Sequence, residues 1–235
     1  NGRIWYHNIS VPRVNLLNKY GDIDANGVYS SPIENPNKRF FTMLGALVAG
    51  RICVGLASVN AAKSALAIAV KHSIKRRQFN GKSEEEEVTL MDYPTHQKRL
   101  IPKIAKSYAY HVALTRLGNE YSQTIGGDMR EIETKAAGLK AMATWHATET
   151  IQECREACGG KGYHSENQIG TLKADSDIFT TFDGDNTVLL QLVSKGLLTN
   201  FKQSFHDEGF RAVIRYLYTK FSHVMAEINP YYVRN

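Results

Sequence analysis

Cysteine, proline and long apolar runs are scarce in this sequence, and each scarcity excludes a class of protein. The 235 residues include three cysteines and six prolines. A small, odd number of cysteines with no visible export signal favours free thiols in a reducing compartment and excludes a disulfide-stapled fold. Every apolar run is interrupted well before the ~18 residues that a membrane-spanning helix needs, so we expect no membrane span.

Metal-ligand spacing is also lacking. Cys154 and Cys158 lie four residues apart, on one face of a predicted helix, and His164 follows them. Because a second pair of ligands at usable spacing is missing, we expect no metal site. The favoured interpretation makes both cysteines small buried hydrophobes.

The overall composition is that of a folded globular protein. Hydrophobic residues make up 43% of the chain and charged residues 22%, and the length is sufficient to bury a sizeable core. The net charge is +6, from 29 Lys and Arg against 23 Asp and Glu. This excess suits a phosphate-bearing ligand but falls short of the dense basic surface of many nucleic-acid-binding proteins, so we expect no nucleic-acid partner.

The N-terminal segment is typical of a β-strand. Residues 4–12 are rich in aromatic and β-branched side chains and end at Pro12, which predicts the last strand of a sheet whose other strands lie upstream. The chain begins with Asn1, which favours an internal segment of a longer protein. We predict the end of a central β domain over residues 1–27, a linker over residues 28–36, and a C-terminal helical bundle domain over residues 37–235.

Helical periodicity dominates from residue 37 onward, so the predicted fold class is mainly α. The apolar spacing predicts one helix, or two in line, over residues 39–77. Further helices are predicted over residues 93–125, 129–158, 186–205 and 208–228. Pro102 should kink the helix predicted over residues 93–125 or lie near its first turn. Residues 80–87, which end in a run of four glutamates, are predicted to be a solvated loop. Small residues between positions 45 and 65 favour close packing within a bundle, with a neighbouring subunit as the alternative.

Two clusters of residues could bind a ligand or take part in a reaction. The first, residues 75–79, reads KRRQF, and its guanidinium groups and aromatic ring would suit a pyrophosphate and an adenine. The alternative is a cation-rich helix C-terminus. The second combines CREACGGKGY at residues 154–163 with TTFDGDNTV at residues 180–188. Its glycines could admit a cofactor against bare backbone or simply end a helix, and its acidic turn could be a polar N-cap.

Together these segments resemble the acyl-CoA oxidase branch of the acyl-CoA dehydrogenase superfamily. The family signatures CREACGGxGY, TFEGDNTVLLQ, RRQF, a Gly-Arg pair in a long helix and VPRENLL have counterparts here. They lie at residues 154–163, 181–191, 76–79, 50–51 and 11–17. The resemblance covers essentially the whole chain and implies the end of the family's central β domain followed by its C-terminal helical domain.

The resemblance also implies a reaction and partners. In the family, an active-site carboxylate removes the α proton of a fatty acyl-CoA while a hydride passes from the β carbon to FAD. Oxygen then reoxidises the flavin, which gives hydrogen peroxide and trans-2-enoyl-CoA. The flavin site is shared across a homodimer.

Site residues are carried over position by position. The catalytic base falls on Asp183, where the family has Glu, and a carboxylate displaced by about 1 Å can lose about a hundredfold in rate. The implied cofactor contacts are Arg76, Gln78, Phe79, Gln97, Gly159, Gly160, Asp185 and Asn186. The implied substrate contacts are Arg51 and Gly184.

Three hypotheses follow in order of preference. The first is an FAD-dependent acyl-CoA oxidase, and the second is an acyl-CoA dehydrogenase that uses a protein electron acceptor. The third is a catalytically impaired homologue, because Asp183 replaces the usual Glu. The location would be cytoplasmic in a bacterium and peroxisomal in a eukaryote.

Overall fold

The computed structural model describes residues 2–81, 86–124, 127–209, 211 and 214–219. The chain forms two units, Asn1–Val48 and Ala49–Asn235. Every predicted site residue belongs to the second unit, which therefore positions the chemistry.

The first unit contains only short elements. These are the 3₁₀ helix η1 (Arg13–Asn15), the strands β1 (Asp22–Ile23) and β2 (Tyr29–Ser30), and the helix α1 (Pro36–Leu44). β1 and β2 pair antiparallel, with Ile23 opposite Tyr29. Asp24 stabilises the turn between them, because its Oδ1 accepts hydrogen bonds from the N–H groups of Asn26 and Val28, both at 2.8 Å.

The strand predicted over residues 4–12 does not form among the described residues. A strand exists only where its backbone pairs with a neighbouring strand, and no strand among the described residues pairs with this segment. Its large apolar side chains are exposed, Trp5 by 71% and Ile9 by 61%. The assignment of residues 1–27 to a β domain stays a prediction.

The second unit is mainly helical, as the periodicity predicts. Its α-helices are α2 (Leu47–Ser73), α3 (Pro94–Thr124), α4 (Arg130–Ala157), α5 (Ile169–Asp177) and α6 (Asn186–Glu208). Between them lie the strands β3 (Arg77–Asn80) and β4 (Glu87–Thr89) and the 3₁₀ helices η2 (Leu90–Asp92), η3 (Gly159–Tyr163), η4 (Ser165–Asn167) and η5 (Ile178–Thr180).

The helical segment predicted over residues 39–77 consists of two helices, α1 and α2, and it ends early. The break falls at Gly45 and Ala46, whose N–H groups bond to the carbonyls of Thr42 and Met43 in a turn. α2 ends at Ser73, so the basic cluster continues into a strand instead of completing a helix. There β3 pairs antiparallel with β4, with Arg77 opposite Thr89.

The acidic run, predicted to be part of a solvated loop, leads into this hairpin: its residues Glu86 and Glu87 are exposed, and among the described residues the loop prediction is wrong only at Asn80 and Glu87, which lie in strands. Glu87 lies in β4, and Glu86 pairs with Arg77 at 3.2 Å. Residues 84 and 85 lie outside the described residues. The hairpin is anchored to the bundle because the Tyr93 hydroxyl donates to the Gln78 carbonyl at 2.8 Å.

The predicted helices over residues 93–125, 129–158 and 186–205 are confirmed as α3, α4 and α6. Pro102 lies well inside α3, so the alternative that places it near the first turn is wrong, and the expected kink stays a prediction. α5 was not predicted. Of the helix predicted over residues 208–228, residues 211 and 214–219 are helical, and residues 210, 212–213 and 220–228 lie outside the described residues.

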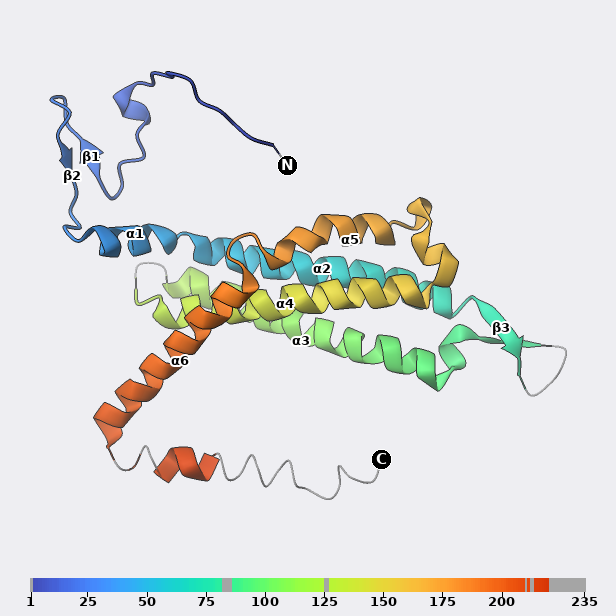
Figure 1. The fold of residues 1–235 in the computed structure, drawn as a ribbon. Helices are drawn as coiled ribbons and strands as arrows, with labels where there is room; N and C mark the ends of the chain where they lie inside the picture. Colours follow the sequence, from blue (N-terminus) through green and yellow to red (C-terminus); the bar gives the residue numbers. More distant parts are fainter. Residues whose placement is uncertain (1, 82–85, 125–126, 210, 212–213, 220–235) are drawn as a thin grey trace. The chain divides into compact units, whose positions relative to one another are not determined.

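The core lies where α2, α3 and α4 pack side by side (Figure 1). Its main cluster joins Leu66 of α2, Leu100 of α3 and Ile151 of α4, each at most 5% exposed. The small residues of α2 serve this packing: a Cβ at Gly55 would lie 2.8 Å from Leu114 of α3. Packing within the bundle is therefore confirmed for this part of the small-residue stripe.

α2 is also long and apolar enough to cross a membrane by length and composition alone. Half of its apolar window is buried inside the fold. A core helix of this kind passes the same test, and its contacts with α3 and α4 account for its apolar character.

Candidate active site and cofactor cleft

Asp183 lies in a strained turn between η5 and α6. Its φ is +54° and that of Gly184 is +112°, so two successive residues adopt left-handed backbone conformations. Glycine does this freely, and aspartate tolerates it better than most residues with a Cβ. The turn leaves Asp183 half-buried.

This turn packs against the N-terminal part of α2. A Cβ placed on Gly50 would lie 2.5 Å from Asp183 Oδ2, so the carboxylate occupies the space that this glycine leaves free. Arg51 donates a hydrogen bond from Nε to the Asp183 backbone carbonyl at 3.2 Å. The structure thus brings together three predicted site positions, Arg51, Asp183 and Gly184, although 132 residues separate the first two.

A buried lysine of α4 also holds the turn. Lys140 of α4 has no exposed surface, and its Nζ donates to the Gly184 carbonyl at 2.8 Å and to Asn186 Oδ1 at 3.0 Å. Burial lowers the pKa of Lys140 to about 8, although Asp183 and Asp185 favour its charged form.

Asp185 and Asn186 are engaged within the chain. Asp185 Oδ1 accepts the N–H groups of Thr187 and Val188 at 2.9 and 3.3 Å, so it caps α6. Asn186 is 2% exposed and donates from Nδ2 to Thr144 Oγ1 at 2.9 Å. The polar N-cap interpretation is confirmed for Asp185, and these contacts give no support to a flavin contact through either side chain.

A separate cleft of about 570 Å³ lies at the far end of α2. It brings together four predicted cofactor residues, Arg76, Gln78, Gly159 and Gly160. Gly159 ends α4 with a φ of +58°, and a Cβ on Gly159 or Gly160 would meet no atom within 4 Å. The remaining lining residues are His72, Leu90, His96, Glu156, Ala157, Cys158, Lys161 and His164.

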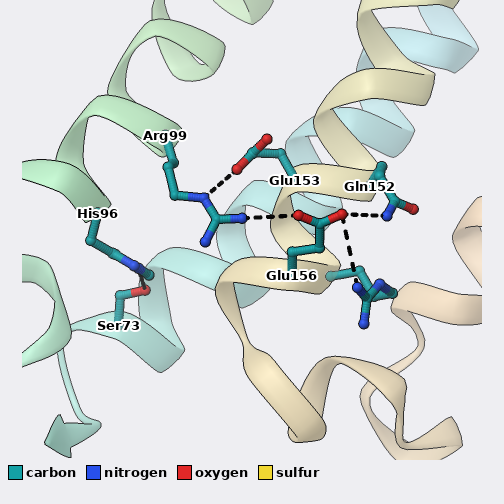
Figure 2. Close-up of polar contacts among 7 residues, drawn as sticks. Ser73, His96, Arg99, Gln152, Glu153 and Glu156 are labelled. Atoms are coloured by element: carbon teal, nitrogen blue, oxygen red, sulfur yellow. Dashed lines mark hydrogen bonds and ion pairs between the residues drawn. The ribbon is translucent and has the colours of Figure 1, made fainter.

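The cleft is rich in nitrogen donors, and burial favours the neutral form of two of them, His72 and His96. Burial lowers the pKa of His72, and the charges of Arg76 and Lys161 add to this effect. Burial likewise lowers the pKa of His96, with Arg99 and His72 contributing. Ser73 links its hydroxyl to His96 Nε2 at 2.6 Å, which fixes the imidazole at the edge of the cleft (Figure 2).

The acidic side chain of the cleft is neutralised by neighbours. Arg99 of α3 forms ion pairs with Glu153 and, at 3.2 Å, with Glu156 of α4 (Figure 2). Gln152 donates to the other Glu156 oxygen at 2.6 Å. The cleft therefore presents Arg76 and Lys161 as its cations while its carboxylate is paired, which suits an anionic ligand.

Besides Asp185 and Asn186, two further predicted cofactor residues lie outside the cleft lining. Phe79 has a φ of +64° and a side chain that is 67% exposed in the hairpin. Gln97 donates from Nε2 to the Met91 carbonyl at 2.9 Å and so stabilises η2. Their role as flavin contacts stays a prediction.

Lys140, the close contact of the Asp183 carboxylate with Gly50, and the cleft histidines were not predicted from the sequence. Helical spacing gave one usable signal, because position 140 falls on the apolar face of α4 between the buried residues Ala137 and Ala141. A charged residue on that face marks a buried cation that needs partners.

A larger hollow of about 730 Å³ lies along α6, but its lining residues all come from that one helix. It is a helix face with none of the predicted site residues. The described residues contain no group of three or more potential metal ligands. Cys154 and Cys158 are buried in the core, and burial raises the pKa of Cys154 to about 12, so its thiol stays protonated.

Comparisons with known proteins match this chain to acyl-CoA oxidases. The family model described as acyl-CoA oxidase, C-alpha1 domain, matches residues 44–198. The chain is 43% identical to peroxisomal acyl-coenzyme A oxidase 3 of Arabidopsis thaliana over 86% of this chain and 30% of that protein.

Solved structures agree. The structure of acyl-CoA oxidase3 from Yarrowia lipolytica matches with a TM-score of 0.73 and 32% identity, over 87% of this chain and 31% of that one. Acyl-CoA oxidase-2 of Caenorhabditis elegans, bound with FAD, ascaroside-CoA and ATP, gives a TM-score of 0.75 and 28% identity, over 86% and 30%. The chain thus spans just under a third of each relative.

Proposed function

The chain belongs to the acyl-CoA oxidase family, and on that premise we propose that it forms the C-terminal part of an FAD-dependent acyl-CoA oxidase. The full protein would oxidise a fatty acyl-CoA to the trans-2-enoyl-CoA and reduce oxygen to hydrogen peroxide. The proposal includes the end of a β domain over residues 1–27, a linker over 28–36 and the helical domain over 37–235.

One observation carries the proposal: Asp183 is half-buried in a left-handed turn, and its carboxylate lies against Gly50. Arg51 donates a hydrogen bond to the Asp183 carbonyl, and Lys140 donates one to the Gly184 carbonyl, so the turn is fixed. A carboxylate fixed in this way can accept a proton at a defined point. We assign it the removal of the substrate α proton. FAD, when bound, supplies the hydride acceptor and the route for electrons to oxygen.

The cleft at the other end of α2 fits the phosphate-bearing part of FAD. Arg76 and Lys161 provide cations, and the open backbone at Gly159 and Gly160 admits a ligand closely. Gln78 adds an amide to the lining. These residues would hold the adenosine diphosphate portion.

The spacing of the two sites supports a flavin site shared between subunits of a homodimer. Gly50 and His72 are 22 residues apart within the single helix α2, which at 1.5 Å per residue separates them by about 33 Å. That distance exceeds the reach of one extended flavin dinucleotide. Asp183 and the cleft of one chain would therefore serve different flavins.

The base assignment is tested by anaerobic mixing of the flavin-loaded full-length protein with a saturated fatty acyl-CoA while flavin absorbance is followed. We expect bleaching in the wild type and a loss of about 10²- to 10⁴-fold in rate for Asp183→Asn. Undiminished bleaching in Asp183→Asn would remove the proposed base.

The same measurement decides whether the protein is an impaired homologue. No bleaching in the wild type, restored by Asp183→Glu, would show that the shorter side chain disables this protein. Rapid bleaching in the wild type would reject that hypothesis.

Oxygen as the electron acceptor is tested by a peroxide assay. We expect one hydrogen peroxide per acyl-CoA oxidised in air. Turnover only with an added protein acceptor and no peroxide would make the protein an acyl-CoA dehydrogenase. Several relatives are named as peroxisomal, and we propose a peroxisomal location if the source is eukaryotic.

A further inference from the structure

Lys140 is a fully buried cation that the proposed chemistry does not yet use. It lies in the middle of α4 with 0% exposure. By contrast, Lys135 on the same helix is exposed and forms ion pairs with Glu120 and Glu131. Among the described residues, Lys140 has hydrogen bonds only to a carbonyl and an amide oxygen. Because a buried charge without an ion pair is costly, its presence calls for a role that an apolar side chain would not fill.

The partners of Lys140 identify that role. Its ammonium holds the carbonyl of Gly184, the residue directly after Asp183. The second acceptor, Asn186, is itself tied to α4 through the Ala141 carbonyl at 3.2 Å and Thr144 Oγ1 at 2.9 Å. One turn of α4 therefore clamps the backbone on the C-terminal side of the base.

Strain makes such a clamp necessary. Two consecutive residues with positive φ persist only where the surroundings hold them. Arg51 bonds the Asp183 carbonyl and Lys140 bonds the Gly184 carbonyl, so the turn is held from α2 and from α4. We propose that Lys140 is a positioning residue for the reaction: its buried ammonium fixes the turn that presents the Asp183 carboxylate. This inference rests on the proposed role of Asp183.

The charge environment gives the proposal a pH signature. Asp183 and Asp185, on the turn, and Arg51, on α2, are the charged groups that act on Lys140. Burial dominates them and lowers the pKa of Lys140 to about 8. Above that pH the neutral amine is a weaker donor than the ammonium, so the clamp loosens.

The test uses anaerobic flavin reduction by a saturated fatty acyl-CoA in the flavin-loaded full-length protein, between pH 6.5 and 9.5. In the wild type we expect the limiting rate to fall as the pH rises through about 8. Lys140→Met should reduce that rate by about ten- to a hundredfold and abolish the fall, because a base displaced by ~1 Å loses about that much. The half-saturating acyl-CoA concentration should change less than the rate, since the Lys140 side chain is fully buried and bonds the chain's own Gly184 and Asn186.

A second readout does not depend on activity. Between pH 8 and 10 the unfolded chain binds a proton at position 140 that the native protein lacks. The native state therefore gains stability as pH rises, and the melting temperature of the wild type should rise relative to Lys140→Met in that window. Lys140→Gln, which keeps a donor without the charge, should also lose both pH signatures and serves if the methionine variant folds poorly.

Two controls separate positioning from mere structure. Lys135→Met removes an exposed lysine from the same helix and should reproduce the wild-type pH profile. Thr144→Val weakens the same buried network but leaves the bond to Gly184, so it should lower the melting temperature and keep the fall near pH 8. The proposal is overturned if Lys140→Met and Lys140→Gln retain the wild-type rate and pH profile. It is also overturned if Thr144→Val changes the rate and the pH profile as much as the two Lys140 variants do.

Asp183→Asn, measured in parallel, separates this inference from the proposed function. If Asp183→Asn abolishes reduction while both Lys140 variants behave like the wild type, only the role of Lys140 is wrong. If Asp183→Asn reduces flavin normally, the proposed base and the inference fall together.

Discussion

A methyl group at position 50 would occupy space that the Asp183 carboxylate fills, because a Cβ built there lies 2.5 Å from Asp183 Oδ2. We expect Gly50→Ala to displace the carboxylate and lower the rate of flavin reduction by about ten- to a hundredfold. The free energy of unfolding should change by less than about 1 kcal/mol, since alanine favours the helix.

Gly118→Ala is the matched control for this change. It adds the same methyl group to a helical glycine whose nearest neighbour, Ile52, lies at an ordinary 3.8 Å. Equal rates in Gly50→Ala and Gly118→Ala would refute a close seat for the carboxylate at Gly50.

At the residue scale, sequence motifs predicted the residues that line the cleft better than the residues that support the Asp183 turn. Arg76, Gln78, Gly159 and Gly160 belong to contiguous family signatures, and the fold gathers them in one cleft. Lys140 lies in no such signature, and its role arises from a contact with Gly184, 44 residues away in the sequence. Contacts of that kind depend on tertiary packing, which local patterns do not encode.

At the element scale, the packing of α3 against α4 contains a buried histidine that should make the protein sensitive to acid. His146 is 5% exposed and shares a hydrogen bond with Ser107 of α3 at 2.9 Å. Burial, with help from Lys103 and Lys106, lowers the pKa of His146 to about 4. Between pH 6.5 and 4 the unfolded chain therefore binds a proton that the native chain does not.

Stability should consequently fall as pH decreases through that window, by up to about 1.4 kcal/mol per pH unit from this group. We expect His146→Gln to flatten the slope in urea unfolding measured from pH 7 to pH 4. His111→Gln, which removes a less buried histidine from α3, should keep the slope. An unchanged acid slope in His146→Gln would show that other groups control it.

Elements with a long apolar period were predictable from the sequence, and short elements without one were not. The long periodic segments predicted α3, α4 and α6, since a buried stripe at helical spacing repeats over many turns. The hairpin of β3 and β4 and the short helix α5 were not predicted. Their residues lack a sustained period, and they depend on single anchors such as the Tyr93 hydroxyl bond to Gln78 and the buried Ile169 at the start of α5.

At the scale of the whole molecule, the separation of the two sites along α2 fixes how a dimer would use them. Asp183 is seated at Gly50 near the start of the helix, and the cleft with Arg76 lies beyond its end. If one flavin spans two subunits, each complete site takes Asp183 from one chain and Arg76 from the other. That arrangement predicts complementation between variants that are inactive alone.

Co-expression of Arg76→Ala chains with Asp183→Asn chains tests this arrangement. Each homodimer lacks one contribution at both sites, whereas a mixed dimer has one site with both residues intact. Random pairing should therefore restore flavin reduction at about one quarter of all sites, measured by bleaching with acyl-CoA at limiting FAD. If each chain used its own Asp183 and Arg76 for one flavin, no mixed dimer would hold an intact site, and the mixture would stay as inactive as its components.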